Sequence, residues 1–380
     1  MRSVSSGQHA PGLRTVRPAQ FRSAQWEDLD VMTTPLSPAA VTEAGRQELP
    51  PYLSNGFVGM RVIDIPLLSG VVLVNGFSGT HPTIQVEGAA QAPYPLAGDI
   101  ALNGVWMRTS PHLAAFVDQR YDFATGELTT RFDYTAGGVT AHVEVLTFCS
   151  RKEPTIVAQE VRVQVDAAAR LTLRAIVDPT QVPGRLARRS LSAPGREEDV
   201  ACDGAIAWES LGGRSRCGVS LVTEALGAPE PEPRLLDWGE DSGLAKEYRF
   251  EARAGATYRL RQIASLVPGQ MHDDPDQEAR RLATKAGAQG FDRLRDDNRR
   301  SWQELWKGRP LIDADDDRWQ RLADAAFFYL NSSVHASAPS STSIYGLAQW
   351  NDYHYYYGHV MWDVDWFCVP PLLLLQPEAA

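Results

Sequence analysis

The chain has 380 residues, of which 43% are hydrophobic and 22% charged, a balance typical of a globular protein large enough for two domains. With 37 Lys and Arg against 47 Asp and Glu, its formal net charge is -10, which argues against nucleic acid as a partner because phosphate binding needs a basic face. The longest strongly apolar run, Leu372 to Leu375, is too short to cross a membrane, and the four cysteines form no C-x-x-C pair of a zinc or redox site. We therefore expect a cytoplasmic protein with a neutral ligand.

The first part of the chain predicts a tail followed by β-structure. Residues 1–24 contain no apolar run and are expected to form a disordered tail. Residues 25–268 are expected to form an antiparallel β-sandwich, because apolar and polar side chains alternate in several short runs without intervening helical patterns. In the run 139–145, for example, valines and an alanine alternate with Thr140, His142 and Glu144, and the runs 161–165 and 171–177 repeat the alternation.

Two connections in this region are interpreted from their turn residues. The stretch YDFATGELTTRFDY predicts a hairpin around Thr125-Gly126, where a glycine supplies the positive φ that a tight turn needs. The stretch NGFVGMR, from Asn55 to Arg61, predicts a tight turn rather than a phosphate site, since no helix clearly follows it. Residues 182–217, rich in Pro, Gly, Arg and Ser, predict a long surface excursion between strands.

Helical spacing begins near residue 274. Residues 269–312 are expected to form a helical linker of two helices with a break around Gly287 to Gly290. The predicted apolar side of this linker consists of Phe291, Leu294, Trp302, Leu305 and Trp306. Residues 313–380 are expected to open an all-helical domain, and its first helix is predicted to bury Trp319, Leu322, Ala326, Phe327 and Leu330.

The acidic run DADDD before that helix has the spacing of a calcium loop. Asp313, Asp315 and Asp317 occupy the first positions, but the sixth position is Arg318, where a calcium loop needs glycine for its turn. We therefore favour a structural role, with these carboxylates capping the helix and facing the positive end of its dipole.

The stretch YGLAQWNDYHYYYGHVMWDVDWF, residues 345–367, carries the strongest chemical signal. Aromatic faces beside carboxylates suit a sugar, because rings pack on the apolar C–H face of a pyranose and carboxylates accept hydroxyl hydrogen bonds. Packing of the same aromatics in a core or at a domain contact is equally compatible with the composition. His354 and His359 lack a third ligand at suitable spacing, so hydrogen-bonded histidines are favoured over a metal site, and no cofactor is expected.

These residues carry a resemblance to glycoside hydrolase family 65, which includes the disaccharide phosphorylases for maltose, trehalose and kojibiose, acid trehalases and related α-glucosidases. GHVMWDVDWFCVPPLLLLQPEA resembles the family signature around G-H-x-F-W-D-x-E, NGFVGMR resembles its N-G-x-x-G-x-R motif, and YDFATGELTTRFDY resembles its L-D-x-x-x-G-x-L hairpin. The resemblance implies a multi-domain β plus α fold: an N-terminal antiparallel β-sandwich, a helical linker and the first helices of an (α/α)6 barrel.

The resemblance also implies a role for particular residues. Trp362 and Asp363 match the pair that holds the non-reducing glucose, and Asp365 stands where the family usually has Glu, one methylene longer. His359 and Tyr345, from the same stretch, complete the candidate substrate-binding set. No catalytic residue is expected within residues 1–380, because the family's general acid Glu lies well downstream of the Trp-Asp pair, and we expect the chain to be a C-terminally truncated piece.

The implied function is the N-terminal portion of an inverting enzyme acting on an α-linked glucose disaccharide or glucoside, and the hydrolase branch is favoured. The alternatives are a disaccharide phosphorylase, with phosphate as co-substrate and β-glucose 1-phosphate as product, and a non-catalytic carbohydrate-binding module or inactive remnant. The resemblance further implies a homodimer for the full-length enzyme, and neither nucleic acid nor membrane is expected as a partner.

Overall fold

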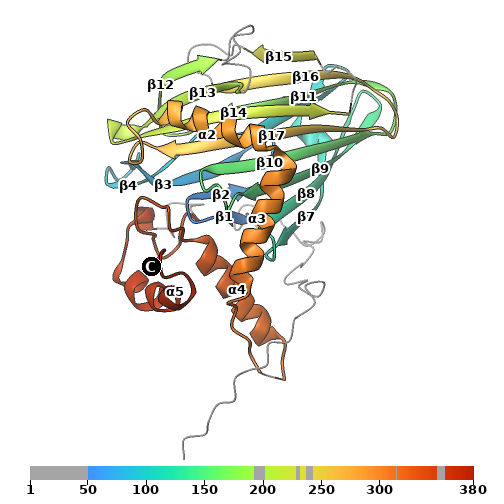
Figure 1. Cartoon of the computed structure of the whole chain (residues 1–380). Helices are drawn as coiled ribbons and strands as arrows, with labels where there is room; N and C mark the ends of the chain where they lie inside the picture. The colour runs from blue at the N-terminus through green and yellow to red at the C-terminus, as the bar shows by residue number, and fades with distance from the viewer. Residues whose placement is uncertain (1–49, 192–201, 228–231, 237–242, 314, 349–355) are drawn as a thin grey trace, which may run out of the picture. The chain divides into compact units, whose positions relative to one another are not determined.

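The computed structural model describes residues 50–191, 202–227, 232–236, 243–313, 315–348 and 356–380. The described strands form antiparallel sheets, as the alternating runs predict (Figure 1). The largest sheet has the strand order β12 (Gly184–Leu191), β13 (Gly204–Ser210), β14 (Arg216–Leu226), β17 (Thr257–Pro268), β10 (Ile156–Val165), β9 (Val139–Cys149), β8 (Glu127–Ala136) and β7 (Ala114–Asp122). A second sheet has the order β15 (Glu232–Leu236), β16 (Leu244–Ala252), β11 (Ala169–Asp178), β5 (Tyr94–Leu102) and β6 (Val105–Trp106). A third, smaller sheet has the order β1 (Tyr52–Ser54), β2 (Val58–Val62), β3 (Gly70–Thr80) and β4 (Glu87–Gln91).

The two larger sheets face each other across one hydrophobic core, which confirms the predicted β-sandwich. Val143 on β9 pairs with Val163 on β10, and both are buried in the same core as Leu173 of β11. His142, their polar neighbour, is exposed on the opposite face, as the alternation predicts. Buried amides also join the sheets: the Gln262 side chain donates to the carbonyl of Ala97 at 2.9 Å.

The predicted hairpin is confirmed, with β7 ending at Asp122 and β8 beginning at Glu127. Gly126 has φ +65°, and the Asp122 carboxylate accepts hydrogen bonds from the backbone N–H of Ala124 at 2.9 Å and the Thr125 hydroxyl at 2.7 Å. An aspartate that satisfies turn donors in this way fixes the hairpin locally.

The prediction of a surface excursion over residues 182–217 is wrong, because β12, β13 and the start of β14 lie in this range and belong to the largest sheet. β13 reads GAIAWES and is buried along its whole length, so it lacks the alternation that would reveal a half-exposed strand. Its outer face is covered by the helix α2 (Pro275–Gln289). The helix lies so close to the sheet that a Cβ on Gly218 would stand 2.0 Å from the carbonyl oxygen of Pro275.

The two predicted helices of the linker are confirmed as α2 and α3 (Phe291–Trp306), separated by Gly290 with φ +83°. Phe291 and Leu294 of α3 pack on an outer apolar patch of the largest sheet, and Trp302 and Trp306 are buried further along the same helix face. The predicted apolar side of this helix is therefore correct.

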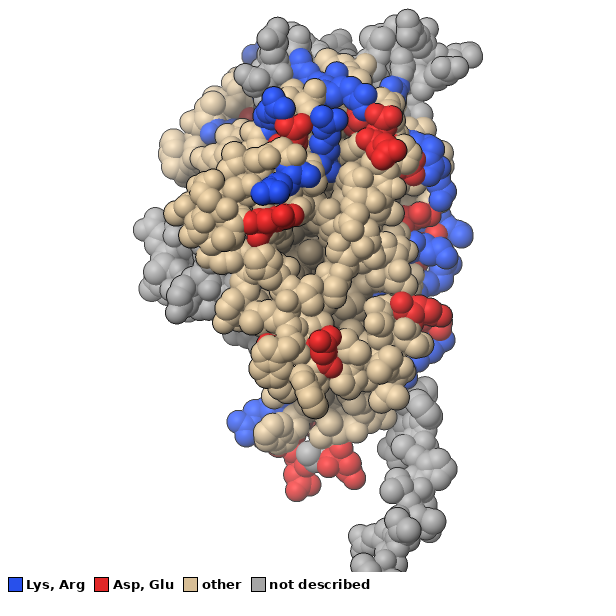
Figure 2. All heavy atoms as spheres, turned by 90° about the vertical axis from the view of Figure 1, so that its left-hand side faces the viewer, with Lys and Arg blue, Asp and Glu red and all other residues tan. Residues whose placement is uncertain are grey.

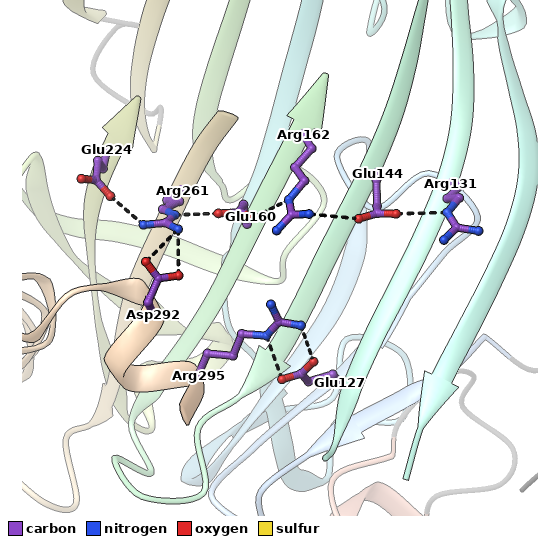
Figure 3. Close-up of polar contacts among 9 residues, drawn as sticks. All are labelled: Glu127, Arg131, Glu144, Glu160, Arg162, Glu224, Arg261, Asp292 and Arg295. Carbon is purple, nitrogen blue, oxygen red and sulfur yellow. Dashed lines mark hydrogen bonds and ion pairs between the residues drawn. The ribbon is translucent and has the colours of Figure 1, made fainter. Parts of the chain in front are cut away.

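Ion pairs fix α3 to the sandwich and tie neighbouring strands together (Figure 3). Glu127 on β8 is nearly buried and accepts paired hydrogen bonds from Arg295 and Arg299 of α3 at 2.6–3.0 Å. Burial opposes ionisation of Glu127, but the hydrogen bonds from the two arginines outweigh it, so the pKa of Glu127 is lowered. Across the strands, charges alternate in a row that contains Glu224, Arg261, Glu160, Arg162, Glu144 and Arg131.

The next helix, α4 (Arg318–Ser332), buries Phe327 of the predicted stripe but not the residues at its start. Trp319 and Leu322 are 60% and 62% exposed, whereas Phe327 and Phe328 are buried. The helix is turned so that the Phe328 ring stacks on Phe123 of the hairpin, with centroids 4.4 Å apart. Contact with the sandwich thus decides which side of α4 is inside, and helical spacing alone does not reveal it.

The acidic run caps α4 through a residue other than those predicted. The Asp316 carboxylate accepts a hydrogen bond from the backbone N–H of Arg318 at 2.9 Å, while Asp317, at the N-cap position, makes no side-chain capping bond. The short helices in the described residues are η2 (Pro111–Leu113), η4 (Leu211–Gly213), η5 (Tyr356–Gly358), the π-helical turn η6 (Val364–Cys368) and α5 (Val369–Leu375). No helix in the described part of the chain is long and apolar enough to span a bilayer.

Candidate substrate-binding region

The Trp-Asp pair lies at the start of a helix with an irregular second turn. Trp362 and Asp363 begin the helix, Val364–Cys368 follow as a π-helical turn, and α5 continues it to Leu375. The N–H of Val369 bonds the carbonyl of Val364, and the prolines at 370 and 371 supply no N–H of their own. π-helical turns inside α-helices occur often at functional sites, since they redirect side chains relative to a regular helix.

The side chains of this segment face outward. Trp362 is 62% exposed, its ring centroid lies 6.3 Å from that of Phe367, and Asp363 is half-buried while Asp365 is exposed. An exposed aromatic ring beside two carboxylates has the chemistry needed to hold a pyranose.

Tyr345 lines a hollow of about 460 Å³ between α4, β1–β2 and the loop of residues 342–348. Tyr52 stacks on Tyr329 in its wall, with ring centroids 6.4 Å apart, and the Arg61 guanidinium lies 5.2 Å from the Tyr52 ring centroid. Arg61 donates to the carbonyls of Pro50 at 2.7 Å and Ala348 at 3.2 Å, and burial lowers the pKa of its guanidinium. Burial likewise raises the pKa of Tyr52, so this hydroxyl stays protonated as a hydrogen-bonding group.

His359 lines a second hollow of about 440 Å³ on the other side of the same loop, against β3 and β4. Its Nε2 is 2.7 Å from the carbonyl oxygen of Glu87. Thr342 and Ser343 line both hollows, so the structure places Tyr345 and His359 at neighbouring but separate positions. Trp362, Asp363 and Asp365 line neither of them.

A buried arginine holds the helical segment against the sandwich. Arg151, in the turn between β9 and β10, donates through Nη1 to the carbonyls of Asn55, Asn331 and Val334 at 2.9, 2.6 and 2.8 Å. Its Nη2 donates to the side-chain oxygen of Gln376 at 2.6 Å. Burial lowers the pKa of Arg151 to about 10, which still leaves the guanidinium charged at neutral pH.

His335 lies beside this arginine and is held neutral. Its Nδ1 accepts a hydrogen bond from the N–H of Ser337 at 3.0 Å, and its Nε2 is 3.3 Å from the carbonyl of Arg151. Burial and the charge of Arg151 lower the pKa of His335 to about 4.

Sequence reasoning did not single out Arg151 or Tyr52, and it interpreted Arg61 only as the end of a turn. Asn55 does form the expected tight turn, since its side-chain oxygen accepts the N–H groups of Phe57 and Val58 at 2.9 and 2.8 Å. His354 lies outside the described residues. Among the described residues, no group of three or more His, Cys, Asp or Glu side chains converges as metal ligands would.

The comparison with protein families gives a match that covers most of the chain and ends before the Trp-Asp pair. The N-terminal domain of glycosyl hydrolase family 65 matches residues 38–305. The chain belongs to this family. Its fold also resembles a solved structure from the human microbiome assigned as a kojibiose phosphorylase, with a TM-score of 0.69 and 15% identity over 86% of this chain and 44% of that one.

Two curated relatives align with parts of the chain. A kojibiose hydrolase of Flavobacterium johnsoniae is 31% identical over 169 residues, which is 44% of this chain and 24% of the relative. A kojibiose hydrolase of Mucilaginibacter mallensis is 26% identical over 267 residues, which is 69% of this chain and 38% of the relative. The aligned part of the chain thus spans between about a quarter and two fifths of these relatives.

Proposed function

We propose that the chain is the N-terminal portion of an inverting enzyme that hydrolyses α-glucosides of the kojibiose type. The observation that carries the proposal is the family match over residues 38–305, together with curated relatives named as kojibiose hydrolases. A disaccharide phosphorylase is the second candidate, because the solved structure with the similar fold is assigned as one.

In this proposal Trp362 and Asp363 hold the glucose ring, with Asp365, His359 and Tyr345 as further substrate-binding residues. The exposed ring of Trp362 and the adjacent carboxylate support the assignment, since both are accessible to a sugar. Their contribution is positioning: a substrate held in a reactive geometry reacts far faster than one that is displaced by an ångström.

Proton transfer in the proposal belongs to residues beyond Ala380. An inverting hydrolase needs a carboxylic acid to protonate the leaving oxygen and a carboxylate about 6.5–9.5 Å away to activate water. A phosphorylase needs only the acid, since phosphate is then the nucleophile. Neither reaction requires a resident cofactor, and the homodimer and the cytoplasmic location remain predictions.

The test compares the 380-residue chain with a protein extended by the codons that follow Ala380 in the source gene. Both are assayed on kojibiose, nigerose, trehalose and maltose, with and without phosphate. We expect glucose release without phosphate from the extended protein and no turnover by the 380-residue chain. Release of β-glucose 1-phosphate only with phosphate would support the phosphorylase instead, and turnover by the 380-residue chain would contradict the proposal.

Variants of the extended protein test the glucose-holding pair. Trp362→Ala and Asp363→Asn are each expected to lower kcat/KM by about 100-fold or more, as expected for lost substrate positioning. Trp366→Ala is the matched control, because Trp366 is as exposed as Trp362 and has no assigned role. Equal activity of Trp362→Ala and Trp366→Ala would contradict the assignment.

A further inference from the structure

The hollow beside His359 is built jointly by the sandwich and by the segment that leads to the Trp-Asp pair. β4 begins at Glu87, and the backbone carbonyl of Glu87 forms a hydrogen bond with Nε2 of His359 at 2.7 Å. A Cβ on Gly88 would lie 2.8 Å from the carbonyl oxygen of Tyr357, and a Cβ on Gly358 would lie 2.6 Å from the Cβ of Ala89. Glycine at both positions is therefore what lets β4 and residues 357–358 come into contact.

The opposite wall of the hollow is the serine- and threonine-rich loop 340–343, which is fastened to the sandwich. The Asn75 side-chain oxygen accepts the N–H of Ser340 at 2.8 Å, and the Ser340 hydroxyl donates to the side-chain oxygen of Gln270 at 2.8 Å. These bonds come from β3 and from the residues after β17, so the sandwich positions both walls. Figure 2 shows the side of the molecule on which β3 ends and β4 begins in Figure 1. Much of its middle and lower surface is uncharged, and a depression lies near its centre.

The chemistry of the lining favours a neutral, hydroxyl-rich ligand. Glu87 is the one carboxylate that lines this hollow in the described residues, and no Lys or Arg side chain lines it. Glu87 is 56% exposed, and its carboxylate accepts one hydrogen bond from the Ser78 hydroxyl at 3.1 Å, which leaves acceptor positions on a group that has about four. Arg214 forms a long ion pair with the second oxygen of Glu87, at 4.0 Å, and does not line the hollow.

His359 adds a second acceptor. Because its Nε2 faces a carbonyl oxygen, that nitrogen carries the proton, and in the neutral imidazole Nδ1 is then an acceptor. The carboxylate of Glu87 and the ring nitrogen of His359 can accept hydrogen bonds from the hydroxyl groups of a ligand. Because no Lys or Arg lines the hollow, a ligand with a phosphate or carboxylate group is disfavoured.

We propose that this hollow binds a neutral hexose ring and that Glu87 of the sandwich selects it by accepting hydrogen bonds from its hydroxyl groups. The hollow's volume of about 440 Å³ lies in the range of small-molecule sites. The choice of glucose as the ring rests on the proposed function, whereas the preference for a neutral polyol rests on the lining residues alone. Glu87 is then a specificity-determining residue on β4, whereas the residues proposed above to bind glucose all lie between residues 345 and 365.

The experiment titrates the 380-residue chain with glucose and separately with inorganic phosphate, and measures binding by isothermal calorimetry or saturation-transfer NMR. We expect glucose to bind and phosphate not to bind. Glu87→Gln should weaken glucose binding by about tenfold or more, because hydrogen bonds to a charged acceptor are replaced by those to a neutral one. Glu144→Gln is the control, since Glu144 is a carboxylate of the outer sheet face already paired with Arg131 and Arg162.

A further variant separates this inference from the proposed function. Trp362→Ala changes the Trp-Asp pair, which does not line this hollow, whereas Glu87→Gln changes the lining itself. We expect Glu87→Gln to weaken glucose binding whatever the effect of Trp362→Ala. Loss of binding in Trp362→Ala but not in Glu87→Gln would overturn the inference while supporting the Trp-Asp pair as the glucose site. Absence of glucose binding, or tighter binding of phosphate, would also overturn it, whereas the proposed function is decided by turnover of the extended protein. An unchanged thermal midpoint of Glu87→Gln, expected for an exposed side chain, verifies that the variant is folded.

Discussion

Removal of the Arg151 guanidinium is expected to loosen the helical segment from the sandwich. Arg151→Met keeps most of the side-chain length but leaves the buried carbonyls of Asn55, Asn331 and Val334 without their donor. Gln376 loses a partner as well. Because these acceptors belong to the turn before β2, to α4 and to the end of α5, the substitution affects several contacts at once.

The magnitude follows from the number of acceptors left behind. A buried acceptor without a partner costs about 1–3 kcal/mol, and the desolvation of the arginine itself, which the variant no longer carries, offsets part of the sum. We therefore expect a loss of about 3–5 kcal/mol in the free energy of unfolding. Arg151→Lys should lie between the variant and the wild type, because an ammonium keeps the charge but not the planar fork that reaches separate carbonyls.

Urea unfolding followed by tryptophan fluorescence measures the free energy of unfolding of these variants, and the ring centroid of Trp302, which lies 5.6 Å from the Arg151 guanidinium, makes the signal sensitive to this site. Arg131→Met serves as the control: Arg131 is 54% exposed and pairs with partly exposed carboxylates, so its loss should cost less than about 1 kcal/mol. A destabilisation of Arg151→Met no larger than that of Arg131→Met would refute the reasoning.

Three further substitutions test other contacts. Folding lowers the pKa of His335 from 6.5 to about 4, so the unfolded chain binds more protons between these pH values and the free energy of unfolding falls as the pH drops. His335→Gln should remove about 2 kcal/mol of the free energy of unfolding that the wild type loses between pH 7 and 4.5. Identical pH profiles of the two proteins in urea titrations would contradict this. Glu127→Gln should lower the free energy of unfolding by about 2–4 kcal/mol at pH 7 in the same assay, because Arg295 and Arg299 lose a nearly buried carboxylate. The difference from the wild type should shrink as the pH falls below 4.5 and the carboxylate of Glu127, whose pKa is lowered, becomes protonated in the wild type. Gly218→Ala should lower the free energy of unfolding by about 1–3 kcal/mol or more, because the added Cβ would overlap the Pro275 carbonyl. An unchanged thermal midpoint would contradict this and would show that α2 can move away from the sheet without loss of stability.

The sandwich was predictable because its strands are half-exposed. Where one face meets the core and the other meets water, as on β9 around Val143 and His142, the alternation is visible in the sequence. β13 was missed for the opposite reason: α2 covers its outer face, so Ile206 and Ala207 are both buried and the period of two disappears. Arg151 could not have been found, since a basic residue in a polar turn looks exposed until the carbonyls that surround it are brought together from distant segments.

The candidate site was predictable in part for a similar reason. Trp362 and Asp363 lie next to each other in the chain, and a short motif reveals such residues. Glu87 and His359 are 272 residues apart, and only the folded chain shows that β4 meets the segment preceding the Trp-Asp pair. A site built from segments far apart in the sequence therefore cannot be predicted from single motifs.

The same division between sandwich and helical segment predicts how local stability is distributed. Strands such as β10 have pairing partners on both sides and buried side chains, whereas α5 exposes Leu373 and Leu374 and is held through Leu372 and Gln376. Amide hydrogen exchange should therefore be slowest in β10 and β17 and at least about 100-fold faster in α5, because regions with few buried contacts open locally at a lower free energy. In Arg151→Met the exchange of α4 and α5 should accelerate while that of β10 stays unchanged. Equal acceleration in β10 would show that the two parts open as one unit, and that Arg151 stabilises the whole fold rather than the junction alone.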